Sequence, residues 1–185
     1  MIAFLTFLLV MSFTPGPNTI MAMVSGQQRG FTRSIILNIG MACGMLVLGA
    51  VAAVFAQWLQ QSPIFITVMK VIGSTYLLYL AYHVATSTPD DSSSQTGGFW
   101  TGVLLQLTNV KVYLYFITGL GAFNLPGFWT ILPVRLALMV VIGSIGTFAW
   151  TAAGQLINGF YHRHFRAVNL AVGALLVFSA VDLWR

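Results

Sequence analysis

Six apolar stretches fill most of this chain, and each is long enough to cross a lipid bilayer. A helix rises about 1.5 Å per residue, so about 20 residues cross roughly 30 Å of hydrocarbon. The stretches are Ile2 to Val24, Ile35 to Gln57, Pro63 to Ala85, Phe99 to Phe123, Pro133 to Leu156 and Phe165 to Trp184. They lack the alternation of apolar and polar residues that marks a transmembrane β-strand. The sequence predicts an all-α membrane protein, with six transmembrane helices in one domain over residues 1–185.

The composition excludes several other classes of protein. With 58% hydrophobic and 6% charged residues and a mean hydropathy of +0.88, the chain cannot cover a soluble surface. Its net charge of +5 comes mostly from arginines near the ends of the stretches, which suits lipid headgroups better than nucleic acid. Cys43 is the single cysteine, so one chain can form no disulfide and no thiolate metal site. We expect lipid as a partner and no cofactor, metal, nucleic acid or enzymatic activity.

Basic residues in short loops predict the orientation. Arg29 and Arg33 lie between the first two stretches, and Arg163 and Arg166 lie between the last two. Both loops should be cytoplasmic, because Lys and Arg accumulate on that side. Both termini are then predicted to be periplasmic. The segment from Met1 to Met11 lacks signal-peptide features, so we expect it to remain in the first span.

One polar segment, Thr86 to Gly98, divides the six stretches into three and three. Its Ser- and Gly-rich composition also fits a plain disordered tether. With three spans in each half, the second half enters the membrane from the opposite face, as an inverted repeat requires. We expect a first repeat at about 1–85, a cytoplasmic linker at 86–98 and a second repeat at about 99–185. Residues 13–17 can be laid over residues 107–111, although such matches arise easily by chance.

The first stretch is interrupted in its middle by Thr14-Pro15-Gly16-Pro17-Asn18. Each proline inside a helix costs about 3 kcal/mol and a glycine about 1 kcal/mol. Pro15 and Pro17 have no amide hydrogen, so the carbonyls of Met11 and Phe13 lose their usual helical donors. In lipid such groups must face protein, water or a ligand.

Beyond this break, Pro17 suits the first position of a new half-helix. The amides of Asn18, Thr19 and Ile20 then become donors at its positive end. One break would thus offer acceptors for an ammonium group and donors for a carboxylate, which fits a zwitterionic amino acid. The alternative is a proline kink that only shapes helix packing.

A second candidate lies halfway along the fourth stretch, at Asn109 and Lys111. A lysine near the bilayer centre should face the bundle interior and have a partner. Lys111 could neutralise a substrate carboxylate or gate access by changing partners; the alternative is snorkelling to the headgroups. Asn109 could orient Lys111 or pair with the freed backbone of the first span. The predicted substrate-binding residues are Met11, Phe13, Thr14, Pro15, Gly16, Pro17, Asn18, Thr19, Asn109 and Lys111.

Two further features have structural interpretations. Lys70 and Asp182 could form an ion pair if the third and sixth helices adjoin; otherwise Lys70 snorkels and Asp182 is solvated. The small residues from Gly40 to Gly44 predict close helix packing, within the chain or in a homodimer, and Gly143 and Gly146 predict the same.

These motifs resemble the LysE/RhtB family of bacterial amino-acid exporters, whose signature is Pro-Gly-Pro in the first span and Asn-Pro-Lys or a variant in the fourth. The similarity covers nearly the whole chain. Val110 stands where proline is commoner, so the resemblance leaves open whether the fourth span is broken. It implies a secondary transporter in the bacterial inner membrane that exports small amino acids or their derivatives.

Within that family, Asn-Val-Lys with Tyr115 and Phe123 looks most like the cysteine/O-acetylserine exporter branch. The alternatives are homoserine/threonine, leucine or a basic amino acid, and, outside the family, a channel or a non-transporting scaffold. We expect proton-coupled exchange, with Lys111 as the candidate titrating group because Asp182 lies near a span end.

Overall fold

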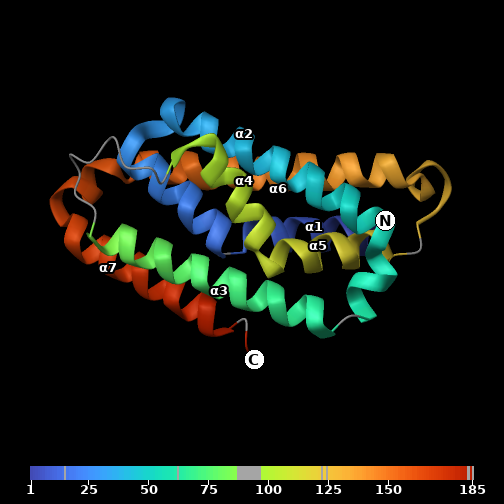
Figure 1. Ribbon diagram of the computed structural model, residues 1–185. Helices are drawn as coiled ribbons and strands as arrows, with labels where there is room; N and C mark the ends of the chain where they lie inside the picture. The colour runs from blue at the N-terminus through green and yellow to red at the C-terminus, as the bar shows by residue number, and fades with distance from the viewer. Residues whose placement is uncertain are drawn as a thin grey trace.

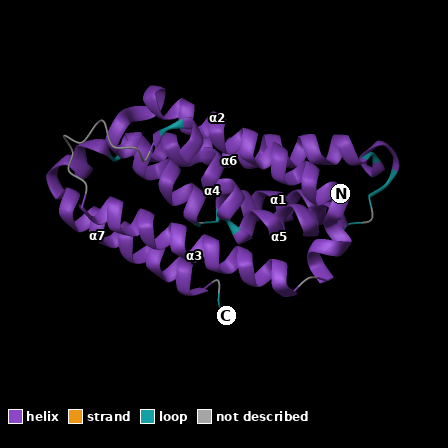
Figure 2. Ribbon diagram, viewed as in Figure 1, coloured by secondary structure: helices purple, strands orange, loops and turns teal. Residues whose placement is uncertain are grey.

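The computed structural model of this chain is an elongated bundle of helices (Figure 1). It describes residues 1–14, 16–61, 63–86, 97–121, 123, 125–182 and 184, and the regular elements in these ranges are all helical (Figure 2). In chain order they are α1 (Ile2–Phe13), α2 (Pro17–Gln61), α3 (Pro63–Thr86), α4 (Phe99–Thr108), α5 (Val110–Gly121), the short 3-10 helix η2 (Gly127–Thr130), α6 (Leu132–Leu156) and α7 (Asn158–Asp182). The predicted all-α class is confirmed.

The helix α2 reverses its direction at a single residue, Gly30. Its φ of 75° and ψ of 166° belong to a region that glycine alone adopts readily. Residues 17–29 and 31–61 therefore form the two arms of a helical hairpin (Figure 1). The Ser34 hydroxyl donates to the Gly30 carbonyl at 2.8 Å and stabilises the turn. The loop predicted between Val24 and Ile35 is wrong, because the chain stays helical on both sides of this glycine.

The length and apolar composition of the helices support a membrane protein. The described residues contain fewer candidate spans than the six that the sequence predicts. Two helical segments in the described ranges are long and apolar enough to cross a membrane, Pro17–Val54 and Leu132–Leu156. The bent pair α4 and α5 makes a third if the two helices are taken as one span, and Phe4–Phe13 is a shorter apolar helix. Val141 and Ile145 on α6 are exposed, as lipid-facing residues would be. Six spans in inverted repeats remain a prediction.

The central contact of the bundle is between α2 and α6, with their backbones touching. A Cβ atom placed on Gly26 would lie 2.1 Å from the Thr151 carbonyl oxygen. One placed on Gly154 would lie 2.0 Å from the Met23 carbonyl oxygen. Because neither position has room for a methyl group, these two glycines set the close approach of the helices.

The glycines that predicted close packing do pack closely. A Cβ on Gly40 would lie 2.0 Å from the Phe99 carbonyl oxygen, across the contact between α2 and α4. Cβ atoms on Gly44, Gly143 and Gly146 would likewise fall within 2.8 Å of neighbouring atoms. The Gly40–Gly44 face is thus used within the chain, and a homodimer remains a prediction.

The helices α3 and α7 form a second pair beside this core (Figure 1). Their contact is apolar at Ala81, Val84, Val172 and Leu176, all buried. The side chains of Lys70 and Asp182, predicted to pair across it, lie outside the described residues.

One end of the bundle gathers the predicted cytoplasmic segments. The Gly30 turn, the end of α3 and the start of α7 all lie at the left end of the bundle in Figure 1. This arrangement agrees with placing Arg29 and Arg33 on the same side as Arg163 and Arg166. The side of the membrane that this end faces remains a prediction, and linker residues 87–96 lie outside the described part of the chain.

Candidate functional site

Two helix breaks meet in the middle of the bundle. α1 ends at Phe13, Thr14 is extended with φ −68° and ψ 135°, and α2 begins at Pro17. α4 ends at Thr108, Asn109 is extended with φ −91° and ψ 103°, and α5 then continues at an angle of 65° to α4. The first span is broken as predicted, although Pro15 itself lies outside the described residues. The fourth span, which the sequence left open, is broken too.

The first break is capped by its own residues. The Gly16 amide donates to the Thr19 hydroxyl oxygen at 2.8 Å, and that hydroxyl lies 3.0 Å from the Gly16 carbonyl oxygen. The Ile20 amide donates to the same carbonyl at 2.9 Å, so the prediction that Ile20 is a free donor is wrong. The first-turn amides of Asn18 and Thr19 have no acceptor within an α-helix and point toward the break.

The second break is made by an asparagine. The Asn109 side-chain oxygen accepts from the Lys111 amide at 3.0 Å, which is the geometry of a helix N-cap. Its backbone carbonyl accepts from the Val112 amide at 2.9 Å. Asn109 thus starts α5 and holds the backbone of Lys111, as one of its predicted roles requires.

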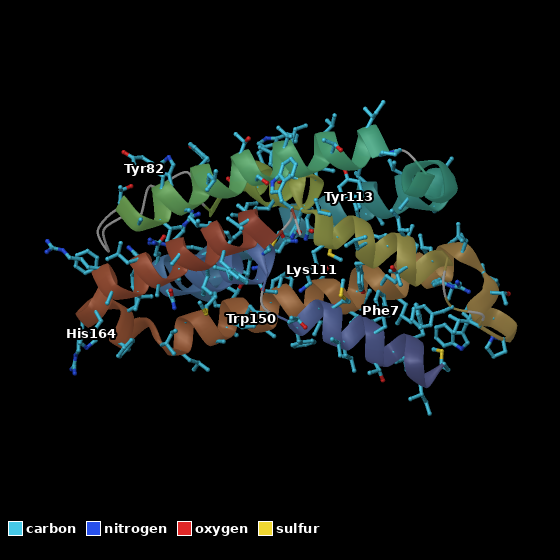
Figure 3. All side chains as sticks on the ribbon, turned by 90° about the horizontal axis from the view of Figure 1, so that it is seen from below. Phe7, Tyr82, Lys111, Tyr113, Trp150 and His164 are labelled. Atoms are coloured by element: carbon cyan, nitrogen blue, oxygen red, sulfur yellow. The ribbon has the colours of Figure 1, made fainter. Side chains whose placement is uncertain are left out.

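Lys111 joins the two breaks. Its ammonium donates to the Thr14 carbonyl at 2.9 Å, across the end of α1, and Figure 3 shows it near the middle of the bundle. Carbonyls at a helix C-terminus carry partial negative charge, so this position stabilises the ammonium. A Cβ on Gly16 would come within 3.3 Å of the Lys111 side chain, so glycine leaves the lysine its space. The backbone carbonyl that accepts from the Lys111 ammonium belongs to Thr14, whereas the sequence predicted the carbonyls of Met11 and Phe13 as the available acceptors.

A buried amide pair lies beside this lysine. The Asn18 side-chain nitrogen donates to the Gln106 side-chain oxygen at 2.6 Å. Neither the Asn18 oxygen nor the Gln106 nitrogen has a partner within the described residues. Flipping both amides exchanges their roles, and in either orientation one amide NH2 group and one oxygen stay unused. The pair therefore offers both a donor and an acceptor to a solute.

These groups surround a cavity of about 50 Å³. An enclosed water needs about 10–15 Å³, so the cavity has room for a few water molecules or for the polar groups of a small solute. Its lining residues are Met11, Ser12, Gly16, Asn18, Thr19, Met45, Gln106, Asn109, Lys111, Val112, Tyr115, Gly143 and Thr147. None of these is acidic, and Lys111 is the cation among them.

The structure gathers most of the predicted site residues around this cavity. Six of the ten line it, namely Met11, Gly16, Asn18, Thr19, Asn109 and Lys111. Thr14 contributes its carbonyl, and Pro17 is buried as the first residue of α2. Phe13 is 40% exposed and does not line the cavity.

Sequence reasoning missed several lining residues, of which Gln106 is the most informative. It is fully buried, and a lone amide in an apolar stretch three residues before Asn109 was an available signal. Ser12, Tyr115 and Thr147 carried no such signal, because hydroxyls are common in membrane helices. Tyr115 donates to the Met139 carbonyl at 2.9 Å, which uses its hydroxyl hydrogen. No cluster of metal-ligating side chains occurs within the described ranges.

Comparison with known proteins finds similarity over nearly the whole chain. The model of the LysE-type translocator family matches residues 9–185. A cysteine/O-acetylserine efflux protein of Salmonella typhimurium is 36% identical over 190 residues, covering 98% of this chain and 96% of the relative. Proteins of that name from Klebsiella pneumoniae and Escherichia coli O6:K15:H31 are 37% and 33% identical, over 98% of this chain and 95% and 96% of theirs. No solved structure matches the chain.

Proposed function

The chain belongs to the family of LysE-type translocators, and from this premise we propose that it exports small neutral amino acids or their derivatives. The observation that carries the proposal is the contact between the Lys111 ammonium and the Thr14 carbonyl in a cavity between two broken helices. The family consists of transporters, and the relatives are named as efflux proteins, so no enzymatic activity is assigned.

The cavity has complementary groups for both ends of an amino acid. In the proposed complex the substrate ammonium takes the Thr14 carbonyl that Lys111 now occupies. The Lys111 ammonium turns to the substrate carboxylate, which also faces the first-turn amides of Asn18 and Thr19. The free donor and acceptor of the Asn18–Gln106 pair then orient the solute. Lys111 thus changes partners when substrate binds.

Charge selects the substrate class. The described lining of the cavity has no acid to pair with a second substrate cation, so basic amino acids are disfavoured. Cysteine and O-acetylserine, the compounds in the names of the relatives, carry no such cation in their side chains. Homoserine, threonine and leucine are the alternatives within this class.

Proton-coupled exchange is the proposed energy source, with Lys111 as the group that takes up and releases the proton. Its support is that Lys111 is the one ionisable amine among the cavity residues and contacts both breaks. Efflux from proteoliposomes should respond to an imposed pH gradient or membrane potential. An unchanged rate under both conditions would reject the coupling and leave the substrate assignment intact.

The proposed topology is six spans in two inverted repeats, in the bacterial inner membrane, with both termini periplasmic. Its support is the pairing of α2 with α6 and of α3 with α7, since corresponding helices of two such repeats can meet at their axis. The two breaks also fall at corresponding places in the first and fourth spans. A periplasm-specific reporter fused to the C-terminus should be active, and a cytoplasmic reporter there should be silent.

Counterflow in proteoliposomes tests the export function. Labelled cysteine, O-acetylserine, threonine, homoserine, leucine and lysine are compared, each with an excess of the same unlabelled compound inside. We expect saturable counterflow for the small neutral compounds and none for lysine. Flux that does not saturate would indicate a channel, and absence of flux for every compound would indicate a scaffold.

A further inference from the structure

A line of polar side chains connects the cavity to the end of the bundle that holds the Gly30 turn. We name it the inner seam and define it as Ser25, Ser34, Asn38, Thr147 and Thr151. Its members lie on both arms of α2 and on α6, and each is at most 4% exposed. They lie inside the bundle, away from any lipid-facing surface.

Hydrogen bonds link the members of the seam in sequence. The Ser25 hydroxyl donates to the Ser34 hydroxyl oxygen at 2.8 Å. The Asn38 amide nitrogen lies 3.0 Å from the Ser34 carbonyl oxygen and 2.9 Å from the Thr151 hydroxyl oxygen. Thr151 in turn donates to the Thr147 carbonyl at 3.0 Å, and Thr147 lines the cavity. The polar groups are therefore continuous with the candidate substrate site.

The seam, together with the exposed Gln155 beyond it, spans about half a membrane. From Thr147 to Gln155 are eight residues of α6, or about 12 Å at 1.5 Å per residue. Half of a hydrocarbon core of about 30 Å is about 15 Å. The Gln155 side-chain oxygen accepts from the Phe31 amide beside the Gly30 turn of α2, one residue before α6 ends at Leu156. The seam thus runs from the middle of the bundle to one end.

The seam is more polar than the contact between α3 and α7. That contact is apolar at Val84, Val172 and Leu176, and across it the Ser74 hydroxyl donates to the Ala180 carbonyl at 3.3 Å. Asn38 is fully buried, and its side-chain oxygen has no partner among the described residues. A buried unpaired carbonyl is unfavourable, and an apolar residue of similar size would avoid that cost.

The seam is closed in this structure. Gly26 and Gly154 bring the backbones of α2 and α6 into contact beside it. No solute can pass while these helices touch, so passage requires them to separate at this end. The hydroxyls and the free Asn38 oxygen would then be exposed along the opening.

We propose that the inner seam is the route by which a zwitterionic solute passes between the cavity and the end of the bundle that holds Arg29, with the Asn38 oxygen as a transient acceptor for its ammonium group. This inference rests on the proposed transport function.

Cysteine accessibility tests the route, because Cys43 is the single native cysteine. In a Cys43→Ser background, Ser34→Cys and Thr151→Cys each replace a hydroxyl by a thiol of similar size. Val172→Cys is the matched control, buried to the same degree at the apolar contact of α3 and α7. The probe is a cationic, membrane-impermeant methanethiosulfonate, applied to inside-out and right-side-out vesicles. O-acetylserine serves as the competing solute, since free cysteine would consume the reagent.

We expect both seam cysteines to react at least about tenfold faster than Val172→Cys from the side that carries Arg29, and O-acetylserine to change their rates. Rates equal to the control from both sides would overturn the route, whatever the efflux activity. If Ser34→Cys does not reach the membrane, Ser25→Cys replaces it in the same comparison. Absence of counterflow in the unmodified protein would count against the transport function, whereas the labelling rates would still decide whether the seam opens.

Discussion

The two helix breaks face one cavity, yet they are formed in different ways. At the first, Pro15 and Pro17 have no amide hydrogen, so two hydrogen bonds of a continuous helix cannot form there in any conformation. At the second, Asn109, Val110 and Lys111 all keep their amides, and the Asn109 side chain takes the Lys111 amide instead. A proline in a helix costs about 3 kcal/mol, whereas a cap contributes about 1 kcal/mol. The first break is fixed covalently, and the second depends on one side chain and its surroundings.

The largest effect should follow from removing the contact that joins the breaks. Lys111→Met keeps most of the side-chain volume and removes the charge, so Thr14 and the substrate carboxylate both lose their cation. A hydrogen bond to a charged group contributes about 1.5–3 kcal/mol, and 1.4 kcal/mol is a factor of ten. We expect counterflow to fall at least about tenfold, at equal amounts of protein in the membrane.

Arg166→Ala is the control for Lys111→Met, because Arg166 is exposed and does not line the cavity. It should retain normal counterflow. Normal counterflow in Lys111→Met itself would remove this lysine from the site.

The next largest effect on counterflow should depend on the size of the side chain that replaces Gly16 at the first break. A Cβ on Gly16 would sit 3.3 Å from the Lys111 side chain, which can shift by a few tenths of an ångström. Gly16→Ala should therefore reduce counterflow by a few-fold, whereas Gly16→Leu should abolish it by filling the cavity. Saturation curves for the two variants measure this difference. Equal activity in both would show that the solute does not approach Gly16.

The first break was predictable because it follows directly from the types of residue in this segment. Two prolines inside an apolar stretch allow few outcomes, and the structure ends α1 at Phe13 and restarts the chain at Pro17 as expected. The finer hydrogen bonding was not predictable. Thr19 and Gly16 cap each other locally, so the Ile20 amide is satisfied inside the helix.

The second break could be located but not established from sequence. Asparagine favours helix caps but also occurs inside helices, so the residue type alone does not establish a break. The extended backbone of Asn109 and its hydrogen bond from the Lys111 amide do. The residues that reach the cavity from other helices, such as Gln106 and Thr147, depend on how the helices pack. Their contribution is tertiary, and no spacing along the chain encodes it.

A smaller effect should come from the cap of the second break. Asn109→Ala removes the acceptor for the Lys111 amide, at a cost of about 1 kcal/mol. Counterflow should fall by a few-fold, and thermal stability in detergent should fall with it. Asn109→Asp keeps a side-chain acceptor and should lose less than Asn109→Ala. If Asn109→Ala matches the unmodified protein in both measurements, packing alone maintains the break.

The smallest effect is expected when proline, the residue type that forms the first break, is placed in the second break at position 110. Val110 is the first residue of α5, where a helix amide has no intrahelical acceptor and proline is well tolerated. Asn109, with φ −91° and ψ 103°, is already close to the extended conformation that a residue before proline prefers. Val110→Pro should therefore keep counterflow within about twofold of the unmodified protein. Val112→Pro is the matched control, because its amide donates to the Asn109 carbonyl at 2.9 Å and would be lost. A large loss in Val110→Pro alone would mean that α4 and α5 must straighten during transport, so that the second break opens and closes while the first stays fixed.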